Sequence, residues 1–267
     1  MENLFSVKDK VVLVTVGAKG IGLMIARGFV LHGAKVYLSG RDGAACEAAA
    51  AELTAEADGK GSGGSAHALP ADLQQLAECE RLAARLGALE PVAGLDVLVN
   101  NAGAAWGAEL DTYPDAAWTK VLTLNLQRAF TLTQLCLPLL GRAAAAGGPA
   151  RVIHIGSIDG LRVPVVQNYA YAASKAGLHH LSRALARELG PRGVTSNVVA
   201  CGPFPTKMMR ATLDRIGDVV RAEVPLGRAG MPEDVAGACL FLASRAGAYC
   251  NGALIRVDGG ASLVSKI

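Results

Sequence analysis

Aromatic side chains, long apolar runs and clusters of basic residues are all scarce in this sequence. Aromatic residues make up 4% of the 267 residues, against 51% hydrophobic and 18% charged residues, so Ala, Val and Leu must form most of a core. No apolar run approaches the roughly 20 residues of a membrane span. The N-terminus also lacks the pattern of a signal peptide. We therefore expect a cytoplasmic protein that does not bind a membrane.

The charged residues and the cysteines are dispersed along the chain. The formal net charge is only +3 and no dense Lys/Arg block is present, which argues against a nucleic-acid-binding surface. The six cysteines include no CxxC pair, so we expect free thiols in a reducing compartment. No cluster of metal-ligating residues is evident, and no metal is expected.

Short apolar segments alternate with helical segments throughout the chain. Strands are expected near residues 11–15, 34–38, 66–69, 95–99, 150–156, 194–200 and 253–257, and helices near 20–32, 42–57, 73–87, 115–140, 169–189 and 232–243. Continuous apolar strands alternating with helices predict a parallel sheet covered on both faces. We predict one α/β domain over residues 1–267, a doubly wound, Rossmann-like fold with its ligand site beyond the carboxyl ends of the strands.

Residues 201–231 form the least regular stretch of the sequence. They contain Pro203, Pro205 and Pro225 and show little periodicity. Their position favours a flap over a substrate, which we place at residues 203–224. The alternative is an ordinary surface excursion.

Tyr171 and Lys175 stand four residues apart in a predicted helix, so the phenol and the ammonium lie on one face about one turn apart. A cation held there favours phenolate and lowers a phenol pKa that is about 10 when unperturbed. Tyr171 is therefore a candidate proton donor or acceptor. The pattern alone is weak, because it arises by chance in many helices.

A glycine-rich turn links the first predicted strand to the first helix. Gly17, Gly20 and Gly22 lie in this turn, together with Lys19 and Ile21. Glycines there let the backbone approach a pyrophosphate, and the helix N-terminus supplies amide donors. We expect this turn to bind a dinucleotide.

The end of the second predicted strand indicates which dinucleotide is bound. An acidic residue there would bind the adenosine ribose hydroxyls, but the chain has Gly40 followed by Arg41. A guanidinium without a carboxylate favours a 2′-phosphate, and hence NADP(H) over NAD(H). Lys19 adds a second cation on the same side. The alternative is that Arg41 is solvated and paired with Asp42.

Two further segments are candidates for the adenosine end of the cofactor. Asp72, with Leu73 beside it, ends the third strand and could accept from the adenine amino group. Asn101, Ala102 and Gly103 close the fourth strand and offer a side-chain amide in a small turn. Asn in such a place often only caps the turn.

With these residues assembled, the chain resembles the short-chain dehydrogenase/reductase family over essentially its full length. The resemblance implies that Ser157 binds the substrate carbonyl, Tyr171 transfers the proton and Lys175 holds the nicotinamide ribose. It assigns Asn125 to a relay water, and Gly202 and Thr206 to the nicotinamide carboxamide. The resemblance also implies a homotetramer or homodimer. Within the family, the segments 151–157, 169–171 and 202–205 look most like the 3-oxoacyl-carrier-protein reductases associated with rhamnolipid synthesis.

Two residues depart from the family pattern. Val16 stands where the family has glycine, and a β-branched residue is costly there if the position requires a positive φ. Cys201 stands where proline commonly precedes Gly202.

The expected activity is NADPH-dependent reduction of a small-molecule ketone, such as a 3-oxoacyl thioester or a β-keto ester. One alternative is an alcohol dehydrogenase that works in the oxidative direction. The other is a non-catalytic NADP(H)-binding sensor, for which Val16 leaves room.

Overall fold

Seven parallel strands form a single sheet in the computed structural model, which describes residues 3–164, 166–206 and 224–264. The strand order is β3-β2-β1-β4-β5-β6-β7. The strands are β1 (Val11–Thr15), β2 (Lys35–Ser39), β3 (Ser65–Ala68), β4 (Val97–Asn100), β5 (Ala150–Ser157), β6 (Val194–Cys201) and β7 (Leu254–Val257). The predicted doubly wound α/β fold is confirmed.

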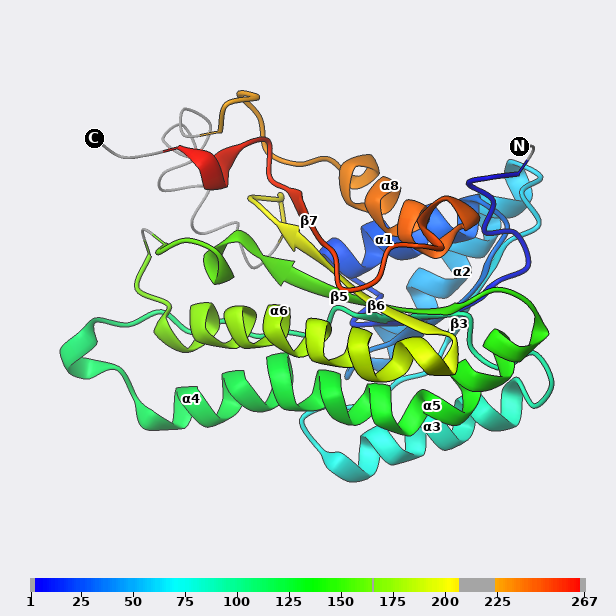
Figure 1. The fold of residues 1–267 in the computed structure, drawn as a ribbon, viewed down its shortest axis with the longest axis horizontal. Coiled ribbons are helices and arrows are strands. Elements are labelled where there is room, and N and C mark those ends of the chain that lie inside the picture. The colour runs from blue at the N-terminus through cyan, green and yellow to red at the C-terminus, as the bar shows by residue number, and fades with distance from the viewer. Residues whose placement is uncertain (1–2, 165, 207–223, 265–267) are drawn as a thin grey trace.

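Helices cover both faces of this sheet, as Figure 1 shows. One face carries α1 (Gly20–Leu31), α2 (Gly43–Gly59) and α8 (Pro232–Ala243), and the other carries α3 (Leu76–Leu89), α4 (Asp115–Leu122), α5 (Arg128–Ala146) and α6 (Tyr169–Leu189). Because every strand-to-strand connection is a crossover, the loops that follow the strands gather at one end of the molecule.

Alternating side chains of the strands feed two separate hydrophobic cores. In β1, Val12 and Val14 pack in the core beneath α1, α2 and α8, whereas Val11 and Leu13 pack in the core beneath α3 and α5. Successive strand residues point to opposite faces, so a strand covered on both sides must be apolar throughout. Burying each such side chain stabilises the fold by roughly 1.5–3 kcal/mol.

Small residues take the place of aromatic ones where helices meet. A Cβ added to Gly28 of α1 would lie 2.6 Å from the Cβ of Ala236 in α8. The two helices therefore approach closely only because one of the two contacting residues is glycine. This packing fits a chain that has few large aromatic side chains for its core.

The topology reverses at β1, which pairs with β2 on one side and with β4 on the other. The chain thus leaves β1 and β4 in opposite directions, which opens a crevice at their carboxyl ends. Thr15 holds the two strand ends together: its Oγ1 accepts from the backbone N–H groups of Asn101 and Ala102, both at 2.8 Å. The predicted site lies at this crevice.

The structure differs from the sequence-based expectation in two helical regions, and a third expectation is not tested. The long helix expected near 115–140 is broken by a π-helical segment, Thr123–Gln127, and continues to Ala146. Helix α3 begins at Leu76 rather than near residue 73, because the preceding residues form a turn. The expected flap at residues 203–224 lies largely outside the described residues.

The stretch Asp115–Ala146 is apolar on more than its inner face. Among the described helices, it is the one long and apolar enough, by length and composition, to cross a membrane. Its most apolar window has a mean hydropathy of 1.2 and is 39% buried. This stretch packs against α3 and α6 in the helix layer on one face of the sheet, and part of its apolar surface stays exposed.

Candidate active site

The N-terminus of α1 faces the crevice with its backbone amides available. Lys19, at the N-cap, makes no side-chain capping bond, and the first turn carries no acidic residue. Gly20 has φ +55°, and a Cβ built on it would lie 3.5 Å from Cγ2 of Thr206. Thr206 follows β6, far away in sequence, so the structure brings two of the predicted cofactor residues together. Free amides at a helix start suit a pyrophosphate.

Gly22 packs against the end of β4. A Cβ on Gly22 would lie 2.2 Å from the carbonyl oxygen of Val16 and 2.6 Å from Nδ2 of Asn101. Asn101 Nδ2 donates to the carbonyl of Thr15 at 2.8 Å. The Asn101 side chain therefore connects the glycine turn to the end of β4, which is the structural role given above as the alternative. A nucleotide would then contact this segment through its backbone and through Ala102 and Gly103.

Val16 adopts the left-handed conformation that favours glycine, with φ +53°. Position 16 therefore requires a positive φ, which is the case in which valine in place of the family's glycine is costly. An L-residue in that region costs roughly 1–2 kcal/mol. The turn keeps its shape because Gly17 on one side and Gly22 on the other are held by close packing.

Arg41 is exposed at the carboxyl end of β2 and makes no ion pair with a described residue. The alternative of an Arg41–Asp42 pair is not found, because Asp42 instead caps α2 by accepting from Ala45 N at 3.0 Å. Lys19 lies on the same side as Arg41 and Asp42, because Lys19 and Asp42 both affect the Cys46 thiol. Burial has the largest effect and raises the pKa of this thiol; Asp42 also raises it, and Lys19 lowers it. Two cations thus flank the predicted 2′-phosphate position.

Asp72 lies four residues beyond the end of β3 rather than at its end. Its Oδ1 accepts from Gln74 N at 3.2 Å, and so stabilises the turn before α3. The side chain of Leu73 is buried in the core, so only its backbone faces outward. The expected place of Asp72 on a strand is wrong, because the polar turn begins earlier than the apolar pattern suggested.

Ser157, Tyr171 and Lys175 converge at the carboxyl end of β5. Ser157 is the last residue of β5, and its hydroxyl lies near enough to the Tyr171 phenol of α6 to favour a lower pKa of that phenol. Lys175 Nζ lies 5.6 Å from the centroid of the Tyr171 ring and donates to the carbonyl of Ile155 at 2.7 Å. The helical spacing of four therefore does place both groups on the face of α6 that meets the sheet.

The electrostatics of this trio differ from the expectation drawn from the spacing alone. Burial raises the pKa of Tyr171 above its ordinary value, and the Ser157 hydroxyl only partly opposes that effect. Burial also lowers the pKa of Lys175 to about 8. The expected acidification of Tyr171 by Lys175 is wrong for the chain's own groups, because desolvation by burial is the largest effect on the phenol and raises its pKa.

Asn125 lies in the π-helical segment Thr123–Gln127 and is buried. Its Oδ1 accepts from Ala104 N at 2.8 Å, and its Nδ2 donates to the Ala104 carbonyl at 2.9 Å. Nδ2 also lies 3.0 Å from Oγ of Ser174, the neighbour of Lys175. The wider π turn thus brings Asn125 to the helix of Lys175, as the predicted relay requires.

Comparisons with known proteins agree with this geometry. A family model described as enoyl-(acyl carrier protein) reductase matches residues 16–262. The rhamnolipids biosynthesis 3-oxoacyl-acyl-carrier-protein reductase of Pseudomonas aeruginosa is 45% identical over 262 residues, 97% of this chain and 99% of that protein. Galactitol 2-dehydrogenase (L-tagatose-forming) of Cereibacter sphaeroides is 35% identical, with 97% of each chain covered.

Solved structures are similar along the whole chain as well. The Pseudomonas aeruginosa RhlG/NADP active-site complex has a TM-score of 0.91 at 45% identity, covering 98% of this chain and 100% of that one. A gluconate 5-dehydrogenase from Burkholderia cenocepacia, in complex with NADP and tartrate, has a TM-score of 0.85 at 29% identity, covering 98% and 99%. The chain belongs to the short-chain dehydrogenase/reductase family. The expected oxidoreductase class is thereby confirmed.

Gly202 is required in this short-chain dehydrogenase/reductase for packing. A Cβ on it would lie 2.7 Å from Cα of Asp258, and its N–H donates to the Val257 carbonyl at 2.9 Å. Cys201, just before it, is buried, and burial raises the pKa of its thiol to about 12. Cys201 is therefore an inert core residue at this turn, still bonded within the β6–β7 ladder.

The sequence reasoning missed two residues that support the site. His179 is not among the predicted site residues, yet its Nε2 accepts from the backbone N–H of Ser157 at 3.4 Å, and burial lowers its pKa to about 4. Ser174 links Asn125 to α6, and its Oγ donates to the Tyr171 carbonyl at 2.7 Å. The sequence did carry an indication for His179, because it follows Lys175 by four residues and so lies on the same face of the helix.

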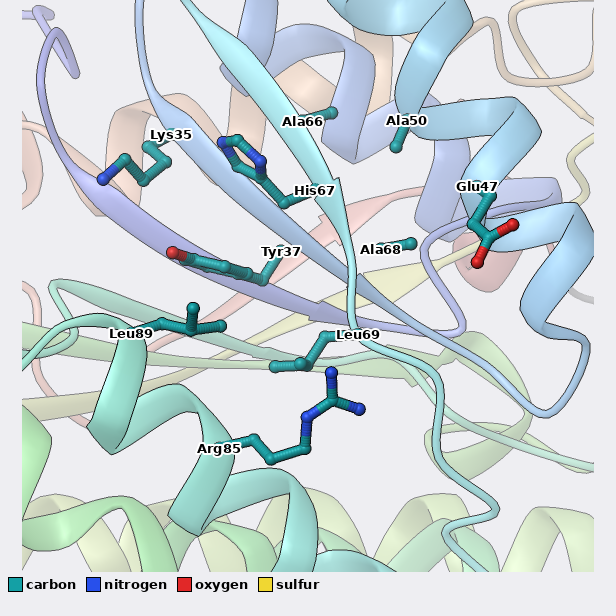
Figure 2. A pocket seen from close by; sticks show the side chains of 10 residues that line it. All are labelled: Lys35, Tyr37, Glu47, Ala50, Ala66, His67, Ala68, Leu69, Arg85 and Leu89. Atoms are coloured by element: carbon teal, nitrogen blue, oxygen red, sulfur yellow. The ribbon is translucent and has the colours of Figure 1, made fainter.

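A surface cavity of about 630 Å³ lies away from the predicted site. Figure 2 shows it over the edge strand β3, with Lys35 and Tyr37 of β2 on one side and Arg85 of α3 below. None of the predicted site residues lines it. Thr54 of α2 satisfies part of the open edge of β3, because its hydroxyl accepts from the N–H of Ala66 and donates to its carbonyl.

Proposed function

We propose that this chain reduces a ketone with NADPH, and that the substrate is a 3-oxoacyl thioester or a related β-keto ester. The observation that carries the proposal is the convergence of Ser157, Tyr171 and Lys175 at the carboxyl ends of the strands, the same end of the sheet at which α1 begins and Arg41 follows β2. The relatives support it: one is named a 3-oxoacyl-acyl-carrier-protein reductase, and two similar structures are described as containing NADP.

The residues present fit a phosphorylated nicotinamide dinucleotide. The uncapped start of α1 suits a pyrophosphate, and Arg41, without a protein partner among the described residues, suits a 2′-phosphate. Lys175 and Thr206 would hold the nicotinamide end. When bound, the dinucleotide supplies a hydride to the carbonyl carbon.

Ser157 and Tyr171 act on the carbonyl oxygen. Negative charge grows on that oxygen during reduction, and two hydroxyl donors preorganised there stabilise it. Tyr171 gives up its proton to the oxygen. Because burial raises its pKa, Tyr171 remains protonated at neutral pH, which is the state that reduction requires. Lys175, with a pKa of about 8, is largely protonated at neutral pH and positions the ribose.

Two other functions of the site make different predictions. An alcohol dehydrogenase needs the phenolate form of Tyr171, which burial disfavours. A non-catalytic sensor needs only the cofactor crevice, and the strained Val16 turn is compatible with weak binding there.

The deciding experiment measures NADPH oxidation with an acetoacetyl thioester, in the parent and in Tyr171→Phe. We expect turnover to fall about 10²–10⁴-fold in Tyr171→Phe while NADPH binding is retained, because the variant lacks only the proton donor. A parent that binds NADPH but reduces no ketone would establish the sensor function instead.

We also propose a homodimer or homotetramer in the cytoplasm. The apolar surface left on Asp115–Ala146 supports the assembly, because 39% burial of its most apolar window leaves a face for a second copy to cover.

A further inference from the structure

A polar cluster lies next to Ser157 in the 3₁₀ turn that follows β5. Asp159 follows Ser157 by two residues, and its backbone N–H donates to Ser157 Oγ at 3.1 Å. Its carboxylate Oδ2 accepts from Asn168 Nδ2 at 3.0 Å. Residues 158–160 form a short 3₁₀ turn, so Asp159 is tied to the catalytic strand end by its backbone and to the start of α6 by its side chain.

This cluster is incompletely satisfied within the protein. Asn168 is only 8% exposed, and its Oδ1 is buried without a hydrogen-bond partner. The second carboxylate oxygen of Asp159, Oδ1, also has no hydrogen-bond partner among the described residues, but unlike Asn168 Oδ1 it is not fully buried. Arg162 does not close the gap, because its guanidinium donates to the Ala261 carbonyl at 2.7 Å and its Nε is unpaired. A buried acceptor without a donor typically costs about 1–3 kcal/mol.

The cluster is also close to the reacting groups and is surrounded by apolar surface. The charge of Asp159 acts on the Tyr171 phenol and raises its pKa, which places the carboxylate near the proton donor. The rim next to it is apolar, with Leu161, Val163 and Val166 at 44%, 93% and 45% exposure. An apolar substrate would offer these two acceptors no hydrogen-bond donor.

We propose that Asp159 and Asn168 form a pair of hydrogen-bond acceptors that recognises an O–H or N–H donor on the substrate, beyond the ketone itself. The inference rests on the proposed ketone reduction and deepens it. Two kinds of substrate carry such a donor: an acyl thioester with an amide N–H in its thiol arm, and a ketone with a hydroxyl on a neighbouring carbon. Both substrates supply the hydrogen-bond donor that the acceptors of Asp159 and Asn168 lack within the protein.

Two matched substrate pairs test the proposal with NADPH as reductant. The first compares the S-acetoacetyl thioester of N-acetylcysteamine with its N-methyl amide analogue. The second compares hydroxyacetone with methoxyacetone. Methylation removes the donor in each pair and adds one methyl group, so the variants below separate loss of the donor from the added bulk. We expect the parent to favour the donor-bearing member of at least one pair by about tenfold or more in kcat/KM, since bonds to a charged acceptor are the stronger ones. The pair that shows the preference identifies the source of the donor.

Variants show whether the cluster is the origin of the preference. In Asp159→Leu and in Asn168→Leu we expect the ratio to fall toward one, while Glu109→Gln, a nearby surface carboxylate that bonds Gln167 instead, leaves it unchanged. Asp159→Asn keeps an acceptor and the shape, and we expect an intermediate ratio even if the leucine variants fold poorly. NADPH affinity reports on the intact fold.

The outcomes separate this inference from the proposed function. Equal turnover of both members of each pair in the parent overturns the inference and leaves ketone reduction standing. A preference that survives in both leucine variants also overturns it. Absence of turnover with all four ketones, despite NADPH binding, overturns the proposed function and the inference with it.

Discussion

Val16 shows how a single residue can conflict with the backbone that surrounds it. Its φ of +53° belongs to the region that glycine enters freely, yet its side chain is β-branched. The neighbouring contacts of Gly17 and Gly22 hold the turn in place, so the strain is carried by Val16 rather than relieved by a change of turn.

Replacing Val16 with glycine should therefore stabilise the protein. The substitution relieves roughly 1–2 kcal/mol of left-handed strain, and part of this is offset by the greater freedom of glycine in the unfolded chain. We expect a net gain of about 1 kcal/mol, seen as a thermal midpoint about 2 °C higher. NADPH should also bind more tightly, measured as a lower Kd.

Val16→Ala is the matched control for this change. Alanine loses the β-branch but keeps a Cβ, so it should recover little of the strain. If Val16→Gly neither raises the midpoint nor tightens NADPH binding, the turn accommodates valine without cost.

We propose that cofactor choice depends on Arg41. It lies free of ion pairs with described residues, because Asp42 is engaged in capping α2. We expect Arg41→Asp to shift preference from NADPH toward NADH by about tenfold or more in kcat/KM, since the change removes a phosphate partner and adds a repulsive carboxylate. The preference is measured as the ratio of kcat/KM for the two cofactors, and an unchanged ratio would refute the role of Arg41.

At the scale of elements, the π-helical segment between α4 and α5 provides a polar link within the site. A regular helix would have continued an apolar stripe through this stretch, but the extra residue of a π turn rotates the next helical residues about the axis. Asn125 is turned inward, where its amide makes three hydrogen bonds to Ala104 and Ser174. The helix irregularity thus joins the loop after β4 to the helix of Lys175.

Asn125→Asp tests this link with almost no change of shape. The variant keeps an acceptor for Ala104 N but loses both Nδ2 donors and places a carboxylate against the Ala104 carbonyl. We expect a loss of about 2–4 kcal/mol in the free energy of unfolding, measured by urea denaturation. Gln127→Glu makes the same chemical change at an exposed position of the same segment and should alter stability by less than about 0.5 kcal/mol. Equal effects of the two would show that the link is not specific to Asn125.

At the scale of the whole molecule, the helix layer of α3, α4, α5 and α6 has one buried and one outward side. The outward side of Asp115–Ala146 stays apolar and includes Phe130 at 42% exposure. Large exposed apolar areas on a soluble domain usually mark an interface. We propose that this apolar surface is used for assembly.

Phe130→Glu should weaken the proposed assembly. A charge in the centre of an apolar interface must be desolvated without a partner, so we expect the species seen by light scattering to shift toward the monomer. Leu89→Glu, on α3 and 52% exposed, is the control and should leave the assembly unchanged. A parent that is already monomeric would refute the assembly.

Much of the fold follows from local pattern. Apolar strands in regular alternation with helices predicted the parallel sheet, and the order of Ser157, Tyr171 and Lys175 predicted which strand and helix meet at the site. The helix boundaries were less predictable. The π turn at Thr123–Gln127 is joined by hydrogen bonds to residues distant in sequence, Ala104 and Ser174, which no local pattern records. The late start of α3 follows from a turn in which Asp72 accepts from Gln74 N, where the apolar pattern had suggested helix.

By itself, the order of residues determined the architecture, the glycine-rich turn after β1 and the helical spacing that brings Tyr171 and Lys175 together, because strand and helix periodicity and short motifs are local properties. Tertiary structure alone decided the protonation of Tyr171, the capping role of Asp42 and the unsatisfied acceptors of Asp159 and Asn168. Each of these depends on how deeply a group is buried and on which distant groups surround it, and burial is settled only when the whole chain has packed.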